Sequence, residues 1–267
     1  MLRGLCLCGV ILASVLQVAC GGVHAQDCAD LMSGHPQFEW TGLQPAVLFT
    51  EYNPWAMAIG SDMPTFALYK DGTVIYWQGD HSKGKYVSAH LSSSQMGDLL
   101  KAARLDELQE VGARYCLEDV TDLPTNVLTV SGPQGYKTIE VYGVIRDLAQ
   151  STQTGLPVQL DTAFRTLLAF RATDAQDWRP PYFEVIVWPF TYAKSSADWP
   201  AEFPGLADKN TKKTRDGYLL FLPIGQLDQY RKFAAGLTSK EAVKINGEKW
   251  TMSARFPFPH EGAPTGQ

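Results

Sequence analysis

The chain has 267 residues, of which 23 are Lys or Arg and 28 are Asp or Glu, so its formal net charge at pH 7 is −5. This mildly acidic balance, without a long run of one sign, argues against a nucleic-acid-binding protein, which needs a basic face. A hydrophobic fraction of 45% at this length fits one large domain or two small ones.

The first 25 residues have the order of a secretory signal peptide. Arg3 precedes an apolar run over residues 5–19, and residues 23–25 (VHA) fit the small-x-small rule for cleavage after Ala25. The run is shorter than the roughly 20 residues that a membrane-spanning helix needs. We therefore expect a mature chain that begins at Gln26 and is periplasmic or secreted.

A second cleavage site competes with this one. Residues 16–20 (LQVAC) resemble the lipobox of bacterial lipoproteins, in which the cysteine is acylated and becomes the new N-terminus. Gln17 departs from that pattern, because an aliphatic or small residue is usual at its position. Lipidation at Cys20 would anchor the protein to a membrane, so a membrane-anchored lipoprotein is the alternative localisation.

The cysteines agree with export. Cleavage after Ala25 leaves only Cys28 and Cys116 of the five cysteines. Two cysteines in an oxidising compartment predict one disulfide bond. The alternative is a nucleophilic Cys116, whose thiol pKa Arg114 would lower, but no histidine lies close to it in the sequence.

The mature chain begins with short apolar runs, of which residues 46–50 predict an edge strand. Asp71-Gly72 separates the β-rich runs 66–69 and 73–77, which predicts a hairpin closed by a tight primed turn. A third strand is expected over residues 85–90.

A helix is expected directly after this third strand, from Ser93 to about Leu108. Ser92 and Gln95 have the spacing of a capping box. Apolar residues then recur at helical spacing, which predicts a face that packs on the sheet. They are Met96, Leu99, Leu100 and Ala103.

The remaining elements follow from alternation, helical spacing and turn residues. The expected strands are residues 126–130, 137–142, 182–188, 218–222, 242–245 and 249–252, the last two joined by Asn246-Gly247. Helices are expected over residues 156–171 and 224–237, and a loop over residues 198–217. Successive hairpins with intervening helices predict an α+β fold, with antiparallel hairpins packed against helices.

The order strand, helix, hairpin occurs over residues 85–142 and again over residues 218–255, which suggests two similar units. The expected organisation has a signal peptide, an N-terminal α+β domain, a connecting helix, a C-terminal α+β subdomain and a flexible tail. Their ranges are 1–25, 26–150, 151–177, 178–257 and 258–267.

Four segments carry a resemblance to a known family: YKDGTVIYW, KYVSAHLSSSQMGDLLKAA, TDLPTNVLTV and GYKTIEVYG. Together they resemble a domain of unknown function in secreted bacterial proteins and lipoproteins, over residues 65–143. Asp122 occupies the place of a conspicuous aspartate of that family. The resemblance implies an exported α+β domain and no particular activity, because its motifs are structural.

The usual motifs of metal, nucleotide and serine-hydrolase sites are absent from the sequence or lack their context. No HExxH, CxxC or GxSxG motif occurs. Residues 79–85 match GxxxxGK, but Tyr86 replaces the Ser or Thr of a P-loop, and a strand is expected where a helix should follow. We therefore expect no cofactor and no metal, and no catalytic residue can be selected.

Trp55 and Trp199 lie beside prolines, and an exposed tryptophan can stack on a sugar or a protein partner. The alternative is that they plug the ends of a sheet core. We interpret the chain as an exported, non-enzymatic binding or envelope-interaction module whose partner is an unknown envelope protein or a glycan. The alternative function is a periplasmic hydrolase whose polar groups assemble only in three dimensions.

Overall fold

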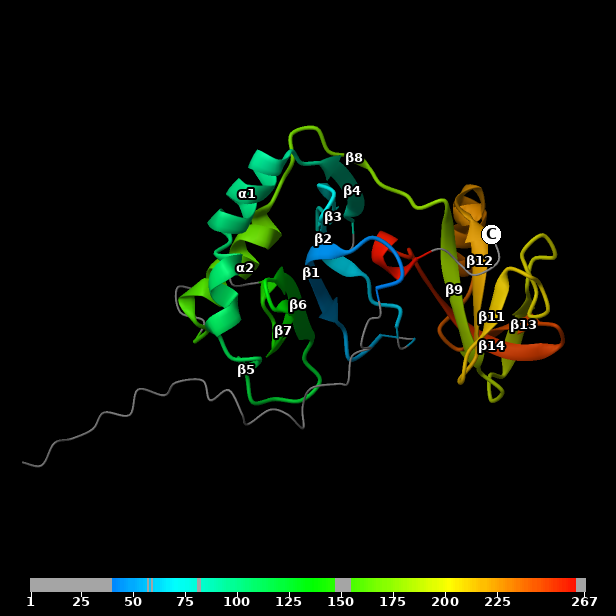
Figure 1. Cartoon of the computed structure of the whole chain (residues 1–267). Helices are drawn as coiled ribbons and strands as arrows, with labels where there is room; N and C mark the ends of the chain where they lie inside the picture. Colours follow the sequence, from blue (N-terminus) through cyan, green and yellow to red (C-terminus); the bar gives the residue numbers. More distant parts are fainter. Residues whose placement is uncertain (1–39, 57, 59, 81–82, 147–154, 263–267) are drawn as a thin grey trace, which may run out of the picture.

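The computed structural model describes residues 40–56, 58, 60–80, 83–146 and 155–262 (Figure 1). Within this part the chain forms an eight-stranded and a six-stranded sheet, each with its own helices. Figure 1 shows α1 and α2 together on one side of the first sheet and the second sheet to the other side of it. The predicted α+β fold class is confirmed.

The first sheet has the order β5-β7-β6-β1-β2-β3-β4-β8. Its strands are β1 (Pro45–Tyr52), β2 (Pro64–Tyr69), β3 (Thr73–Gln78), β4 (Lys85–His90), β5 (Arg114–Cys116), β6 (Thr125–Gly132), β7 (Gly135–Tyr142) and β8 (Gln176–Asp177). Neighbouring strands are antiparallel except β5 and β7, which are parallel. Strands β1 to β4 form a meander across the middle of the sheet, in which each strand pairs with the next one along the chain.

The hairpin at Asp71-Gly72 is present, but its turn is not the predicted primed turn. Three residues, 70–72, connect β2 to β3, and of these only Gly72 has a positive φ, of 95°. The Asp71 carboxylate accepts a hydrogen bond from the Thr73 amide at 2.9 Å. This local bond holds Asp71 outside the left-handed region, so the turn is a three-residue loop with glycine at the positive-φ position.

The two-residue primed turn occurs instead at Asn246-Gly247, where φ is 50° and 87°.

The first helix begins where predicted but ends early. In α1 (Ser93–Ala102) the Ser92 Oγ accepts from the Gln95 amide, and the Gln95 side chain accepts from the Ser92 amide at 2.8 Å. The helix ends because Arg104 adopts φ 52°, after which a 3₁₀ helix, η1 (Leu105–Glu110), follows. Arg104 is held there by a hydrogen bond to Glu107 at 2.7 Å.

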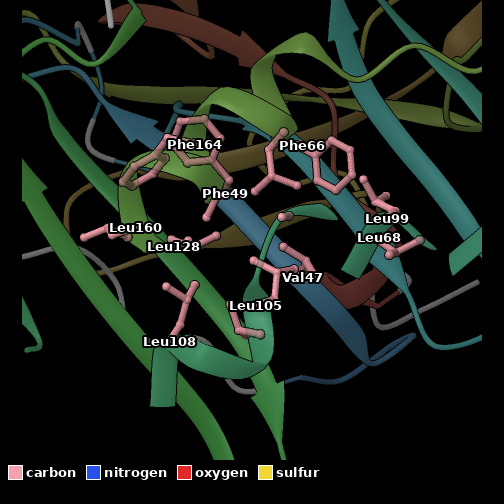
Figure 2. Close-up of a cluster of buried hydrophobic side chains, with 14 of the residues drawn as sticks. Val47, Phe49, Phe66, Leu68, Leu99, Leu105, Leu108, Leu128, Leu160 and Phe164 are labelled. Carbon is pink, nitrogen blue, oxygen red and sulfur yellow. The ribbon is translucent and has the colours of Figure 1, made fainter. Parts of the chain in front are cut away.

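The core of the first sheet lies between its inner face and α1, η1 and α2 (Val158–Ala169) (Figure 2). Phe164 of α2 meets Phe49 of β1 edge to face, with ring centroids 5.3 Å apart. The predicted connecting helix is therefore part of the first core. Its apolar face, with Leu160 and Leu167, has to be buried against a sheet, and the first sheet offers the matching face.

The second sheet has the order β10-β13-β14-β9-β12-β11. Its elements are β9 (Tyr182–Pro189), β10 (Ser195–Asp198), β11 (Thr211–Lys213), β12 (Tyr218–Pro223), η3 (Ile224–Gln226), α3 (Leu227–Ala235), β13 (Glu241–Ile245) and β14 (Glu248–Arg255). Strand β11 lies within the predicted loop 198–217. The helix α3 covers one face, where Tyr230 packs on Phe183 with centroids 5.3 Å apart.

Strand, helix and hairpin do occur twice in the order of elements, but the two sheets use them differently. The hairpin β6-β7 is separated from β4 by β1, β2 and β3, whereas β13-β14 is separated from β12 by β9 alone. In the first sheet, the hairpin strand nearer the middle of the sheet is β6, which comes first along the chain. In the second sheet it is β14, which comes second. The two units are therefore not copies in topology.

The last described residues cover the outer face of the first sheet. This C-terminal strap, residues 256–262 with the 3₁₀ helix η4 (Pro259–Glu261), leaves β14 and packs on Leu48, Tyr69 and Tyr86. Figure 1 shows it in red beside the blue strand β1. The flexible tail predicted from residue 258 is thus wrong for residues 258–262, because the central strands carry apolar residues on both faces and the outer face needs a cover.

Candidate functional site

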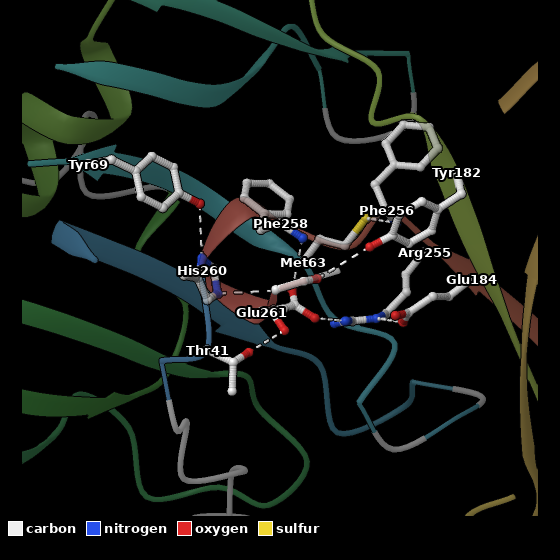
Figure 3. A network of polar contacts seen from close by, with 11 residues as sticks. Thr41, Met63, Tyr69, Tyr182, Glu184, Arg255, Phe256, Phe258, His260 and Glu261 are labelled. Carbon is white, nitrogen blue, oxygen red and sulfur yellow. Dashed lines mark hydrogen bonds and ion pairs between the residues drawn. The ribbon is translucent and has the colours of Figure 1, made fainter. Parts of the chain in front are cut away.

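A buried ionic cluster lies where the strap leaves the second sheet (Figure 3). Arg255 donates to the Glu184 carboxylate at 2.6 Å and also pairs with Glu261. The three side chains are only 11%, 10% and 17% exposed, respectively. One cation thus joins β9 and β14 to η4. The cluster fixes the strap, because any one of these charges would be left unpaired without the others.

A histidine–tyrosine pair holds the other end of the strap. The Tyr69 hydroxyl lies 2.9 Å from Nδ1 of His260. Burial, assisted by the charge of Arg255, lowers the pKa of His260 to about 3, and burial raises the pKa of Tyr69 well above its usual range. Both groups are therefore neutral near pH 7. A histidine this hard to protonate is a poor general base, so the pair serves to hold the strap.

The loop between β1 and β2 presents Trp55, which is 71% exposed. Its backbone is held by Asn53: the Trp55 amide donates to Asn53 Oδ1 at 2.9 Å, and the Ala56 amide donates to Asn53 O at 3.0 Å. Asp62 closes the base of the loop by accepting from the Asn53 amide at 3.2 Å. The predicted contact residue Trp55 is therefore a surface tryptophan on a hydrogen-bonded loop.

Asp62 is the most unusual carboxylate of this region. Burial raises its pKa, the Asn53 amide opposes that shift, and no basic side chain of the described part lies within 4 Å of it. Burial and the charge of Asp62 also raise the pKa of Tyr52 above its usual range. A carboxyl group with a raised pKa can hold or deliver a proton nearer to neutral pH than an ordinary aspartate.

Trp199, the other predicted contact residue, is a packing residue. Its indole Nε1 donates to Pro204 O at 3.0 Å, and its ring packs against Phe203 and Phe233 with centroids 5.2 and 5.7 Å away. It is half-buried and packs against the core of the second sheet beside α3. Of the two possibilities that the sequence left open for Trp199, this packing agrees with the second, a plug at the end of a sheet core. The sequence could not distinguish them, because a tryptophan before a proline has the same local pattern in both cases.

The cysteine predictions fall mostly outside the described residues. Cys116 ends β5 and pairs in register with Tyr142 of β7. Cys28 and Cys20 lie outside the described part of the chain, so the Cys28–Cys116 bridge and lipidation at Cys20 stay predictions.

Other candidate sites can be placed in the same way. Lys85 begins strand β4, so the GxxxxGK segment leads into a strand. Asp122 is an exposed turn residue with φ 66°. In the part of the chain that the structure describes, no group of three or more His, Cys, Asp or Glu residues is arranged to hold a metal ion. None of the helices described has the length and apolar character needed to cross a membrane.

The ionic cluster at Arg255 was missed by the sequence reasoning. One signal was present: Glu184 stands alone in the apolar run YFEVIVW of β9. A charged residue inside a buried strand needs a partner, but the partner's identity depends on which strand lies beside β9.

Comparison with known proteins adds no relative: no family model, no curated protein and no solved structure matches the chain. The resemblance over residues 65–143 therefore stays a prediction.

Proposed function

We propose that this protein is an exported, non-enzymatic binding module that contacts an envelope protein or a glycan through Trp55. The observation that carries the proposal is the 71% exposure of Trp55 on a loop whose backbone is already held by Asn53 and Asp62. An exposed indole on a hydrogen-bonded turn loses little conformational entropy on binding, which is why tryptophan is frequent among binding hot spots.

The experiment is site-specific photocrosslinking in cells that produce the protein. A photoreactive phenylalanine analogue replaces Trp55, and a matched control carries it at Val120, which is also exposed but lies on another loop. We expect a discrete adduct from position 55 only, suppressed by an excess of the unlabelled protein and not by its Trp55→Ala variant. If position 55 gives no more adduct than position 120, the proposal is wrong.

Export is the part of this proposal supported by the leader sequence. Intact mass of the mature protein, from soluble and membrane fractions, distinguishes its two forms. A soluble chain that begins at Gln26 supports free export, whereas a membrane-bound chain that begins at an acylated Cys20 supports a lipoprotein. A chain that retains Met1 contradicts both forms.

A periplasmic hydrolase is the second candidate function, and the observation that favours it is the raised pKa of Asp62 beside the loop of Trp55. Such a carboxyl group suits a general acid. The test measures turnover of chromogenic ester, amide and glycoside substrates by the protein and by its Asp62→Asn variant. Turnover that the substitution abolishes, at unchanged Tm, supports the hydrolase; turnover that persists in the variant, or none in either protein, rejects it.

A further inference from the structure

Strand β10 is an open edge of the second sheet. It pairs with β13 on one side, in parallel, and no strand of the described part of the chain lies on its other side. Its residues Ser195, Ser196 and Asp198 are exposed. With four residues it is the longest of the strands at the edges of the two described sheets. An unpaired strand edge is a template for pairing with another strand.

The backbone groups of two residues in β10 point away from β13. The Trp199 amide donates to Lys244 O at 3.1 Å, and Asp198 is in register with Lys244. In a parallel pair, residues that bond the neighbouring strand alternate with residues that face the other way. Ala197 and Trp199 therefore face β13, whereas Ser196 and Asp198 face outward. In the part of the chain that the structure describes, their N–H and C=O groups have no hydrogen-bond partner.

The opposite edge of the same sheet is better protected against pairing. Strand β11 includes Lys212 and Lys213, both exposed, and exposed lysines on an edge strand oppose association with another strand. Strand β10 (SSAD) contains no lysine or arginine. Its edge is therefore the more open of the two.

The charges beside this edge complement each other when two copies pair in antiparallel fashion. Lys194 directly precedes the strand and Asp198 ends it, so each lies two residues from Ser196. When Ser196 pairs with Ser196 of a second copy, Lys194 of each copy stands opposite Asp198 of the other. Within the described residues, neither of these charges belongs to an ion pair.

Two neighbouring registers are less favourable. Pairing centred on Asp198 sets two carboxylates opposite each other, which is repulsive. Pairing centred on Ala197 sets Lys194 opposite Pro200, whose nitrogen has no hydrogen to donate. The register centred on Ser196 avoids both defects and brings opposite charges together.

We propose that β10 is the interface through which a second copy of this chain binds, with the two β10 strands antiparallel about a two-fold axis at Ser196. Each Ser196 N–H donates to the Ser196 C=O of the other copy, and each Lys194 pairs with Asp198 of the other copy. The second sheet then continues from one copy into the next. This interface includes neither Trp55 nor its loop.

Sedimentation velocity of the full mature protein over a concentration series tests the association. We expect a reversible monomer–dimer equilibrium with a Kd of about 10–100 µM, because the contact between two four-residue strands is small and small interfaces are weak. The Kd should rise with salt concentration, since exposed ion pairs are screened.

Exchange of the two charges makes the test specific. Lys194→Glu and Asp198→Lys each set like charges opposite each other, and each should raise the Kd about tenfold. The double variant Lys194→Glu/Asp198→Lys restores opposite charges and should recover the original Kd within about twofold. Lys213→Glu, on the exposed edge β11, makes the same change in net charge as Lys194→Glu and should leave the Kd unchanged.

A cysteine at the two-fold axis reports the register. In Ser196→Cys the same residue of both copies meets at the axis, with Cα atoms about 5.5 Å apart, a separation that a disulfide can span. Under oxidising conditions we expect a covalent dimer from this variant. Ser94→Cys, at an exposed position of α1, should give no more covalent dimer than the unaltered protein.

The proposal is overturned if the protein sediments as a monomer up to about 1 mM, where even weak association is detected. It is also overturned if Lys194→Glu dimerises as tightly as the unaltered protein, or if the double variant stays as weak as the single ones. Equal cross-linking of Ser94→Cys and Ser196→Cys would place the contact elsewhere and reject β10. All these substitutions are at exposed positions, so an unchanged Tm is expected in each variant.

Discussion

Replacing Arg255 by alanine should be among the most destabilising single changes in this protein. The substitution leaves the Glu184 and Glu261 carboxylates, which are 10% and 17% exposed, without their shared cation. Removal of one partner from a buried ion pair typically lowers the free energy of unfolding by about 3–5 kcal/mol. Because Arg255 also joins β9 and β14 to η4, we expect a loss within this range.

Urea unfolding at pH 7 measures the effect through the midpoint and the slope m. The matched control is Arg215→Ala, which removes an exposed ion pair with Asp216 and should leave the midpoint unchanged. A second variant, Arg255→Met with Glu184→Gln and Glu261→Gln, removes the charges together and should recover much of the loss. If Arg255→Ala costs under about 1 kcal/mol, or if the triple variant is less stable than the single one, the ionic cluster does not hold the strap as argued.

Three further predictions concern the strap, the tryptophans and the cysteines. The pKa of His260 is lowered to about 3 in the folded protein, so as the pH falls the unfolded chain binds a proton at this histidine before the folded chain does. The free energy of unfolding should therefore be highest above about pH 6.5 and should fall by about 1.4 kcal/mol per pH unit between about pH 6.5 and 3. The difference in unfolding free energy between the protein and His260→Gln should show this slope, and a difference independent of pH would refute it. Trp55→Ala should leave stability within about 0.5 kcal/mol of the original, whereas Trp199→Ala should lower it by about 3–5 kcal/mol; equal midpoints in denaturant would contradict the assignment of Trp199 to the core. Reduction of the mature protein should add two mass units, for one Cys28–Cys116 disulfide, and lower its stability by on the order of 4 kcal/mol; an unchanged mass would return Cys116 to the reactive candidates.

Structural features whose signals lie within a few neighbouring residues could be predicted from the sequence. The capping box at Ser92 and the Asn246-Gly247 turn involve residues within a few positions of each other, and both were predicted in place. The end of α1 was misplaced because it depends on the left-handed Arg104 and its bond to Glu107. The apolar spacing continues through Leu105 and Leu108, so periodicity alone cannot mark the break.

The two candidate tryptophans show the same difference between what neighbouring residues predict and what long-range packing sets. Trp55 and Trp199 stand beside prolines in equally irregular segments. One is presented on the surface by Asn53, and the other is half-buried against Phe233 of α3. The difference lies in what packs against each segment, which is information carried by distant parts of the chain.

Local patterns along the chain specify the fold class and most of the strands and helices, because alternation, helical spacing, caps and turn residues act over a few neighbouring residues. The tertiary structure decided which elements share a core. It placed α2 in the first core, laid the strap across the outer face of the first sheet, and joined Glu184, Arg255 and Glu261. The ionic contacts join residues up to 77 positions apart, from 184 to 261, and the Tyr69–His260 contact of the strap joins residues 191 positions apart. They form because apolar faces and buried charges must find partners wherever the chain brings them.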